Sequence, residues 1–179
     1  MLKTALWIVL AAVAVILIIA AMRPDRFRIE RSIVIKAPPD RIFALVNDLH
    51  EWEPWSPWEK IDPALKRTYS GSKSGVGAIY EWSGNSQVGQ GRMEIVESSP
   101  FSKVALDLHF MKPFEAKNKV EFVLTPQTGN PEMTQVTQAM FGPSPFVSKL
   151  MGLVFNMDKM VGGKYEEGLA NLKALAERS

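Results

Sequence analysis

One stretch decides the fold that the sequence predicts: residues 80–95, which read YEWSGNSQVGQGRMEI. Aromatic and polar residues alternate at its start, the turn-forming pair Gly84-Asn85 follows, and a second alternating run ends at Ile95. Because side chains alternate between the two faces of a strand, Tyr80 and Trp82 share one face. We therefore expect an antiparallel hairpin whose apolar face either lines a ligand cavity or packs into the core.

The opposite face of this hairpin carries charge. Glu81 and Arg92 point away from the aromatic face, whereas Met93 and Ile95 are the apolar partners on the second strand. We expect a Glu81–Arg92 ion pair on the surface, which would stabilise the hairpin by only about 0–1 kcal/mol.

The sequence around the hairpin predicts further strands between two helical regions. A strand and a helix precede it, the helix beginning after Pro39. The final helix contains Gly162-Gly163, which should loosen or bend it. The predicted strands are residues 27–38, 66–71, 77–85, 89–100, 103–114, 116–127 and 132–142, and the predicted helices are residues 40–49 and 146–177.

The connector after the first helix is rich in tryptophan. Trp52, Trp55 and Trp58 recur at every third residue, which favours a tight helical turn broken by Pro54 and Pro57. The cluster would cap the open end of the sheet, which we favour, or form a pocket gate or a membrane contact.

The order of these elements implies an α+β architecture, in which a curved antiparallel sheet is wrapped around a long C-terminal helix. Alternation places Asp107, His109 and Glu121 on the solvent side of their strands. The rows that face inward are Val104, Leu106, Leu108 and Phe110, then Val120, Phe122 and Leu124, then Val136, Gln138 and Met140.

The N-terminal segment Thr4–Met22 is 19 residues long and carries no charge. At 1.5 Å per residue, a helix of this length spans roughly 28 Å, close to the thickness of a bilayer core. A cleaved signal peptide is the alternative, but its apolar region is usually shorter, and Ala20-Ala21-Met22 is a poor cleavage site. We predict a single-pass anchor in residues 1–25, followed by one domain in residues 26–179.

Basic residues around the anchor bear on its orientation. Arg23, Arg26, Arg28 and Arg31 follow the apolar segment, whereas only Lys3 and the terminal amine precede it. We expect a single pass through the inner (cytoplasmic) membrane. The positive-inside rule favours the orientation in which the domain faces the cytoplasm. Arg28 and Arg31 also fit the solvent face of the first strand, which leaves the opposite orientation open.

Charge and cysteine content exclude several classes of function. Residues 27–179 contain 18 basic and 18 acidic residues, so this part lacks the basic surface of a nucleic-acid binder. The chain has no cysteine, which excludes disulfides, thiolate metal sites and cysteine nucleophiles.

Candidates for chemistry are few. Asp107 and His109 share a strand face, as would a histidine general base and the carboxylate that orients it. That face points to solvent, however, and no nucleophile is spaced to join them. Gly89 and Gly91 precede no helix, so they fit a bulge or close packing better than a phosphate loop. We expect no catalytic residue, no metal and no cofactor.

Several strings resemble a known family: WEPWSPWEK, YSG, VGAIYEWSGN, VGQGRMEI and MDKMVGGKYEEGLANLK. From about Arg26 to the C-terminus the chain is similar to the polyketide cyclase/dehydrase-like branch of the START-type (SRPBCC) superfamily. That resemblance implies a helix-grip fold with a hydrophobic cavity between sheet and long helix. Members of the wider superfamily bind lipids, sterols and polyketides, and a few are enzymes. Gln138 departs from the pattern, because similar chains often carry an aromatic residue there.

We therefore predict a membrane-tethered module that binds a small hydrophobic molecule. The alternatives are a cyclase- or hydrolase-type enzyme that uses polar groups of the pocket, and a protein-interaction module at the membrane. The residues expected to line the cavity are Tyr69, Tyr80, Trp82, Met93, Leu106, Leu108, Phe122, Gln138, Met140, Val154 and Met157.

Overall fold

The computed structural model describes residues 2–178, in which the predicted strands are all present. The strands are β1 (Arg26–Ile35), β2 (Lys66–Gly71), β3 (Ala78–Ser83), β4 (Gln90–Ser99), β5 (Lys103–Lys112), β6 (Ala116–Gln127) and β7 (Asn130–Pro143). The α-helices are α1 (Leu2–Ala21), α2 (Pro39–Asn47), α3 (Phe146–Val154) and α4 (Met157–Ala176). Two short 3-10 helices, η1 (Leu49–Trp52) and η2 (Pro57–Lys60), form the tryptophan-rich connector.

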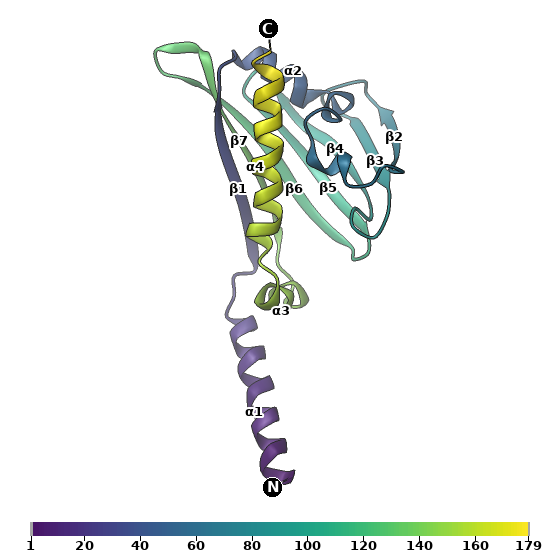
Figure 1. The fold of residues 1–179 in the computed structure, drawn as a ribbon, viewed down its shortest axis with the longest axis vertical. Helices are drawn as coiled ribbons and strands as arrows, with labels where there is room; N and C mark the ends of the chain where they lie inside the picture. Colours follow the sequence, from purple (N-terminus) through teal and green to yellow (C-terminus); the bar gives the residue numbers. More distant parts are fainter. Residues whose placement is uncertain (1, 179) are drawn as a thin grey trace.

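The strands form one antiparallel sheet in the order β1-β7-β6-β5-β4-β3-β2. Strands β2 to β7 follow one another as a meander, and β1 pairs with β7, so the first strand in the chain lies beside the last. The sheet is curved, and α4 runs along it next to β1 and β7 (Figure 1). Helix α2 and the connector also contact α4 (Figure 1). The α+β helix-grip prediction is confirmed.

The core lies between the sheet and these helices, and the predicted inward rows are buried. Leu106, Phe122 and Val136 have no exposed surface, whereas Asp107 on the other face of β5 is exposed. Alternation therefore assigned the faces of β5, β6 and β7 correctly, because burial on one side of a sheet imposes a period of two.

The C-terminal helix differs from the prediction. We expected one helix bent at Gly162-Gly163, but the chain forms α3 and α4, separated at Phe155-Asn156. Phe155 is extended, and the side chain of Asn156 accepts a hydrogen bond from the backbone N–H of Lys159 at 2.9 Å, as an N-cap does. A capping residue ends one helix and starts the next here, and the two glycines lie inside α4.

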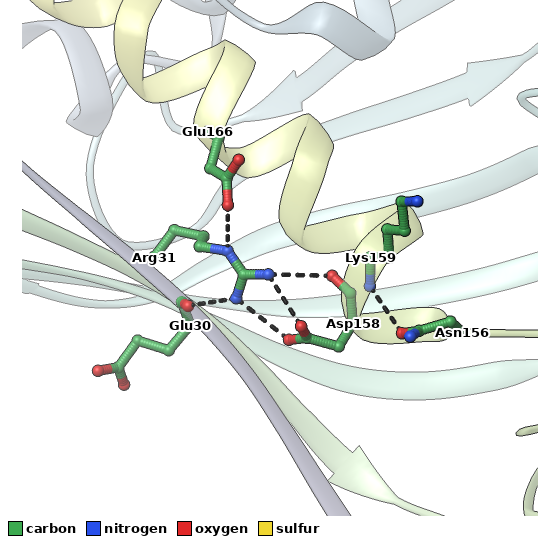
Figure 2. Close-up of polar contacts among 6 residues, drawn as sticks. All are labelled: Glu30, Arg31, Asn156, Asp158, Lys159 and Glu166. Atoms are coloured by element: carbon green, nitrogen blue, oxygen red, sulfur yellow. Dashed lines mark hydrogen bonds and ion pairs between the residues drawn. The ribbon is translucent and has the colours of Figure 1, made fainter.

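Gly162 has a packing role. A Cβ atom at this position would lie 2.2 Å from Nη2 of Arg31, so a side chain here would displace the Arg31 guanidinium from its place on the helix surface. Figure 2 shows Arg31 reaching from β1 to two acids of α4. Its Nε donates to Glu166 at 2.6 Å and its Nη2 to Asp158 at 2.9 Å, while Nη1 donates to the Glu30 carbonyl at 2.8 Å. This network fixes the position of α4 on β1.

The hairpin of β3 and β4 has the expected register, with Tyr80 opposite Met93 and Trp82 opposite Gly91. The ladder is irregular next to Gly91, where a Cβ atom would lie 2.3 Å from the Trp82 ring, so this glycine permits close packing. The predicted Glu81–Arg92 ion pair is absent from residues 2–178. Arg92 lies opposite Glu81 but bonds Glu94 at 2.7 Å, two residues along its own strand.

Helix α1 projects from the base of the domain (Figure 1). Residues Lys3–Ala21 have a mean hydropathy of 2.8, and the segment is long and apolar enough to cross a membrane. A signal sequence near an N-terminus has the same properties, so the helix fits either role.

Candidate ligand cavity

A cavity of about 180 Å³ lies between the inner face of the sheet, the first half of α4 and the tryptophan-rich connector. Aromatic and aliphatic side chains form most of its wall, and exposed residues of its rim, such as Trp58 and Gln87, open it to the surface. The lining residues are Trp52, Trp55, Ser56, Pro57, Trp58, Glu59, Leu65, Tyr80, Trp82, Gln87, Val88, Met93, Leu108, Phe110, Val120, Gln138, Met140, Val161, Lys164, Tyr165 and Gly168.

The β3–β4 hairpin provides one aromatic wall. The rings of Tyr80 and Trp82 are stacked with centroids 6.0 Å apart, and Phe110 of β5 meets Trp82 edge-on at 5.8 Å. The indole N–H of Trp82 donates to the Val88 carbonyl at 3.0 Å, so its polar edge is satisfied within the hairpin. Trp82 therefore presents mainly apolar surface to the cavity.

The connector closes the cavity on another side. Trp52 and Trp55 are buried, and their indole N–H groups donate to the carbonyls of Val46 and Leu45 in α2 at 3.0 and 3.4 Å. Both rings pack edge-on against Phe122. These contacts fix Trp52 and Trp55 as a cap over the sheet, while Trp58, at 39% exposure, lies at the rim.

A hydrogen-bonded group of polar residues lies in the cavity wall. The hydroxyl of Tyr80 donates to Glu59 Oε1 at 2.6 Å, and Nε of Arg67 donates to the other carboxylate oxygen at 2.5 Å. Burial and the bond to Glu59 raise the pKa of Tyr80. The Tyr80 hydroxyl therefore stays protonated and donates its hydrogen bond to Glu59. The negative charge of Glu59 is balanced by the guanidinium of Arg67. We did not predict Glu59, because its only sequence signal is a place in the connector.

Two other polar side chains of the wall differ from this group. Gln138 of β7 and Tyr165 of α4 are 93% and 95% buried, yet within residues 2–178 neither side chain makes a hydrogen bond. Their polar atoms keep some accessible surface, since no fully enclosed polar atom lacks a partner in this part of the chain. Burial raises the pKa of the Tyr165 hydroxyl, which stays neutral. Ser56, another buried residue of the wall, likewise makes no side-chain hydrogen bond within residues 2–178, whereas Lys164 of the lining bonds Glu167 at 2.7 Å. The cavity thus offers uncharged amide and hydroxyl groups, and its one lysine is already paired.

The structure brings six of the predicted cavity residues together along this wall: Tyr80, Trp82, Met93, Leu108, Gln138 and Met140. Leu106 and Phe122 lie on the same face of the sheet but are completely buried in the core. Tyr69 does not line the cavity. It lies beside Tyr80, with centroids 5.2 Å apart, and stacks on His50 at 4.1 Å.

The other two predicted residues, Val154 and Met157, lie outside the cavity and are exposed. The reason is the break between α3 and α4, which carries the chain away from the sheet at Phe155-Asn156. Tyr165 takes the place that we expected for them. Its position in the apolar stripe of α4 was visible in the sequence, but its proximity to the cavity was not.

The solvent face of the sheet holds the Asp107–His109 pair. Asp107 bonds Lys119 at 2.7 Å and His109 bonds Glu115 at 3.0 Å, so each side chain has its own surface partner. Within residues 2–178, no three His, Asp or Glu side chains are grouped as metal ligands.

The fold and the cavity together define a helix-grip protein of the START-type superfamily. Residues 26–177 match the family described as polyketide cyclase/dehydrase and lipid transport, and the chain belongs to this family. No significant match was found among curated proteins.

Solved structures show the same fold. A protein of Chromobacterium violaceum has a TM-score of 0.58 at 16% identity, with 87% of this chain and 100% of that chain covered. One from Nitrosospira multiformis has a TM-score of 0.59 at 18% identity, with 85% and 97% covered. A START superfamily protein from Mycobacterium smegmatis has a TM-score of 0.55 at 15% identity, with 84% and 97% covered.

Proposed function

We propose that this chain binds a small, uncharged lipophilic molecule in the cavity and is held at the membrane by residues 4–22. One observation carries the proposal. The cavity wall is mostly apolar and aromatic, yet it contains three buried neutral polar side chains, Gln138, Tyr165 and Ser56, without a side-chain hydrogen-bond partner in residues 2–178. A ligand with an apolar body and one polar group matches both features.

Binding would be driven by burial of apolar surface. Each ligand CH₂ group that leaves water contributes roughly 0.8 kcal/mol. The Gln138 amide can donate and accept, as can the Tyr165 hydroxyl, so a ligand hydroxyl, carbonyl or amide fits both. A carboxylate does not fit, because the Glu59 carboxylate already lies in the wall, and the nearby cations Arg67 and Lys164 are paired with Glu59 and Glu167.

The size of the cavity limits the ligand. At about 180 Å³ it is larger than the ~150 Å³ apolar cavity that admits benzene, and smaller than the ~300–1,000 Å³ pockets of drug-sized ligands. A ring system or a short branched chain fits inside, and a longer tail would leave by the rim near Trp58. A complete phospholipid is excluded by volume.

The enzyme alternative requires an inward acid or base whose pKa lies near the working pH. Tyr80 and Tyr165 are shifted away from neutrality, since burial raises the pKa of both hydroxyls. Near neutral pH they act as hydrogen-bonding groups, so neither tyrosine supports acid–base catalysis.

The test is native mass spectrometry of the full chain in mild detergent, with neutral lipophiles (isoprenoid alcohols, monoacylglycerols and quinones) compared with fatty acids. Val161→Trp would place a large ring in the cavity from α4, whereas Ala170→Trp would place the same ring on the exposed face of that helix. We expect the neutral class to bind the wild-type chain and Ala170→Trp, but not Val161→Trp. Binding by no member of the panel, or equal binding by both variants, would overturn the proposal.

A further inference from the structure

Helix α3 and the start of α4 carry an exposed apolar surface. We call this surface the α3 patch. It consists of Phe146, Val147, Met151, Val154, Phe155, Met157 and Met160, each between 44% and 79% exposed. Contiguous apolar surfaces of this kind mark contacts with a partner or a membrane. Nothing in the ligand cavity uses these side chains, because none of them lines it.

The α3 patch has little charge. No acidic residue occurs from Ser144 to Met157, and between the patch residues Met157 and Met160 lie Asp158 and the exposed Lys159. The one basic residue from Ser144 to Met157, Lys149, is buried, and its Nζ bonds Asp25 at 2.5 Å. The nearest acid, Asp158, is bonded to Arg31. Helix α3 therefore offers apolar side chains to its surroundings without an exposed ionic group of its own.

Helix α3 lies against the end of α1, at the point where the apolar segment stops. The two helices contact each other, and Ala20 near the end of α1 is fully buried (Figure 1). A Cβ atom at Gly152 of α3 would lie 2.7 Å from Nη1 of Arg23, the first charged residue after the segment. The Ser144 N–H also donates to the Asp25 carbonyl at 2.7 Å, which ties the chain before α3 to this junction.

This position fixes the depth of the patch relative to a membrane. If α1 spans the bilayer, Arg23 lies at the level of the lipid head groups, where arginine side chains are favourable. Helix α3, in contact with Arg23, then lies in the same interfacial layer. A short helix with an apolar surface is stable in this layer, because its apolar side chains enter the acyl region while its backbone is internally bonded.

We propose that the α3 patch binds the surface of the lipid bilayer next to the exit of α1, with Val154 and its neighbours in contact with acyl chains. The inference rests on the proposed membrane anchor. A nine-residue helix needs little affinity of its own, since α1 holds it beside the bilayer at a high effective concentration. The chain would thus contact the membrane at two places, α1 and the α3 patch, and these contacts would fix the orientation of the domain relative to the bilayer.

The test uses the absence of native cysteine, which allows a single label in the full chain. Val154→Cys reports on the α3 patch and Val13→Cys on α1. Val76→Cys is the matched control, because Val76 is exposed and its neighbour Gly75 bonds the carbonyl of Asn47 in α2. Helix α2 lies at the end of the domain away from α1 (Figure 1). Each variant carries an environment-sensitive fluorophore and is reconstituted into vesicles of phosphatidylcholine and phosphatidylglycerol that contain nitroxide-labelled acyl chains.

We expect the labels at positions 13 and 154 to be quenched about threefold or more, and the label at position 76 to be unchanged. Quenching at 13 with none at 154 would overturn the inference and leave the anchor in place. A label at position 154 that is shielded from water but not quenched by the acyl chains would also overturn the inference. It would indicate contact with a protein partner or with a second copy of the chain. Absence of quenching at both positions would overturn the anchor and the patch together.

Discussion

At the scale of single residues, the polar side chains of the cavity differ in whether they already have a hydrogen-bond partner in the protein. Tyr80, the aromatic residue that first suggested a binding wall, donates its proton to Glu59 at 2.6 Å. Gln138 and Tyr165 have no such partner within residues 2–178. The polar end of a ligand would therefore meet β7 and α4, and the hairpin of β3 and β4 would contribute apolar surface.

A substitution at Gln138 should change protein stability and ligand affinity in opposite directions. Gln138→Leu removes a buried amide that lacks a protein partner, so the free energy of unfolding should rise by about 1 kcal/mol. Affinity for a neutral polar ligand should fall about fivefold, since one hydrogen bond is worth ~1 kcal/mol. Gln135→Leu, on the exposed face of β7, is the matched control and should leave affinity unchanged. Thermal melts and ligand titrations measure both, and a less stable Gln138→Leu variant would contradict this account.

Alkaline pH should destabilise the protein through its buried tyrosines. The pKa of Tyr165 is raised by burial, so above pH ~10, the usual pKa of tyrosine, the folded state binds more protons than the unfolded state. Stability should be constant through neutral pH and fall as pH rises above ~10. Urea denaturation from pH 8 to pH 11 measures this slope. Tyr165→Phe should make the slope shallower and leave neutral-pH stability nearly unchanged, and an identical slope would contradict the explanation.

At the scale of elements, the placement of α4 depends on a contact between a strand arginine and a helix glycine. Arg31 of β1 bonds Asp158 and Glu166 at either side of Gly162 (Figure 2). The sequence predicted a loosened or bent helix at Gly162-Gly163, whereas the structure divides it at Asn156. Only the second is a helix boundary, because Asn156 caps the backbone of α4 while Gly162 is needed for packing.

The two adjacent glycines of α4 provide a matched pair of substitutions. Gly162→Ala should lower the free energy of unfolding by about 1–3 kcal/mol, because its methyl group would overlap the Arg31 guanidinium. Gly163→Ala should raise it by about 0.5–1 kcal/mol, since no atom lies within 4 Å of its Cβ position and alanine favours helix. Chemical denaturation distinguishes them. Equal effects of the two changes would mean that propensity alone, and not the Arg31 contact, explains Gly162.

At the scale of the whole molecule, the domain and α1 meet at a junction built from Arg23, Asp25 and α3. The cavity lies between the sheet and α4, and the connector closes it. Helix α3, which carries most of the α3 patch, lies beside the end of α1 (Figure 1). An anchored domain of this kind would meet lipophilic ligands at the high local concentration found near a bilayer.

The proposed anchor predicts that the chain is retained uncleaved. After expression in bacteria, the protein should stay in the membrane pellet during alkaline carbonate extraction, because residues 4–22 are apolar enough to span the bilayer. Its intact mass should correspond to the chain with residues 4–22 still attached. A soluble product that lacks the N-terminal segment would instead establish a signal peptide, and would contradict the anchor without affecting the cavity.

The α+β class, the succession of strands and helices along the chain, and the faces of β5, β6 and β7 could all be predicted from the sequence. These features follow from local patterns, namely the period of two in the strands and the turn residues between them. The apolar N-terminal segment is equally visible, because it is a run of residues without charge. The sequence also identified most of the aromatic wall, because Tyr80, Trp82 and Met93 lie in one short hairpin.

Three features depend on the folded arrangement and could not be predicted: which polar side chains of residues 2–178 lack a hydrogen-bond partner, where the C-terminal helix divides, and the packing role of Gly162. The reason is distance along the chain. Arg31 and Asp158 are 127 positions apart, and Tyr80 and Glu59 are 21 apart, so no local pattern connects them. Whether a buried hydroxyl has a partner depends on such remote contacts. In this protein they distinguish Tyr165, which makes no side-chain hydrogen bond within residues 2–178, from Tyr80, which is bonded to Glu59.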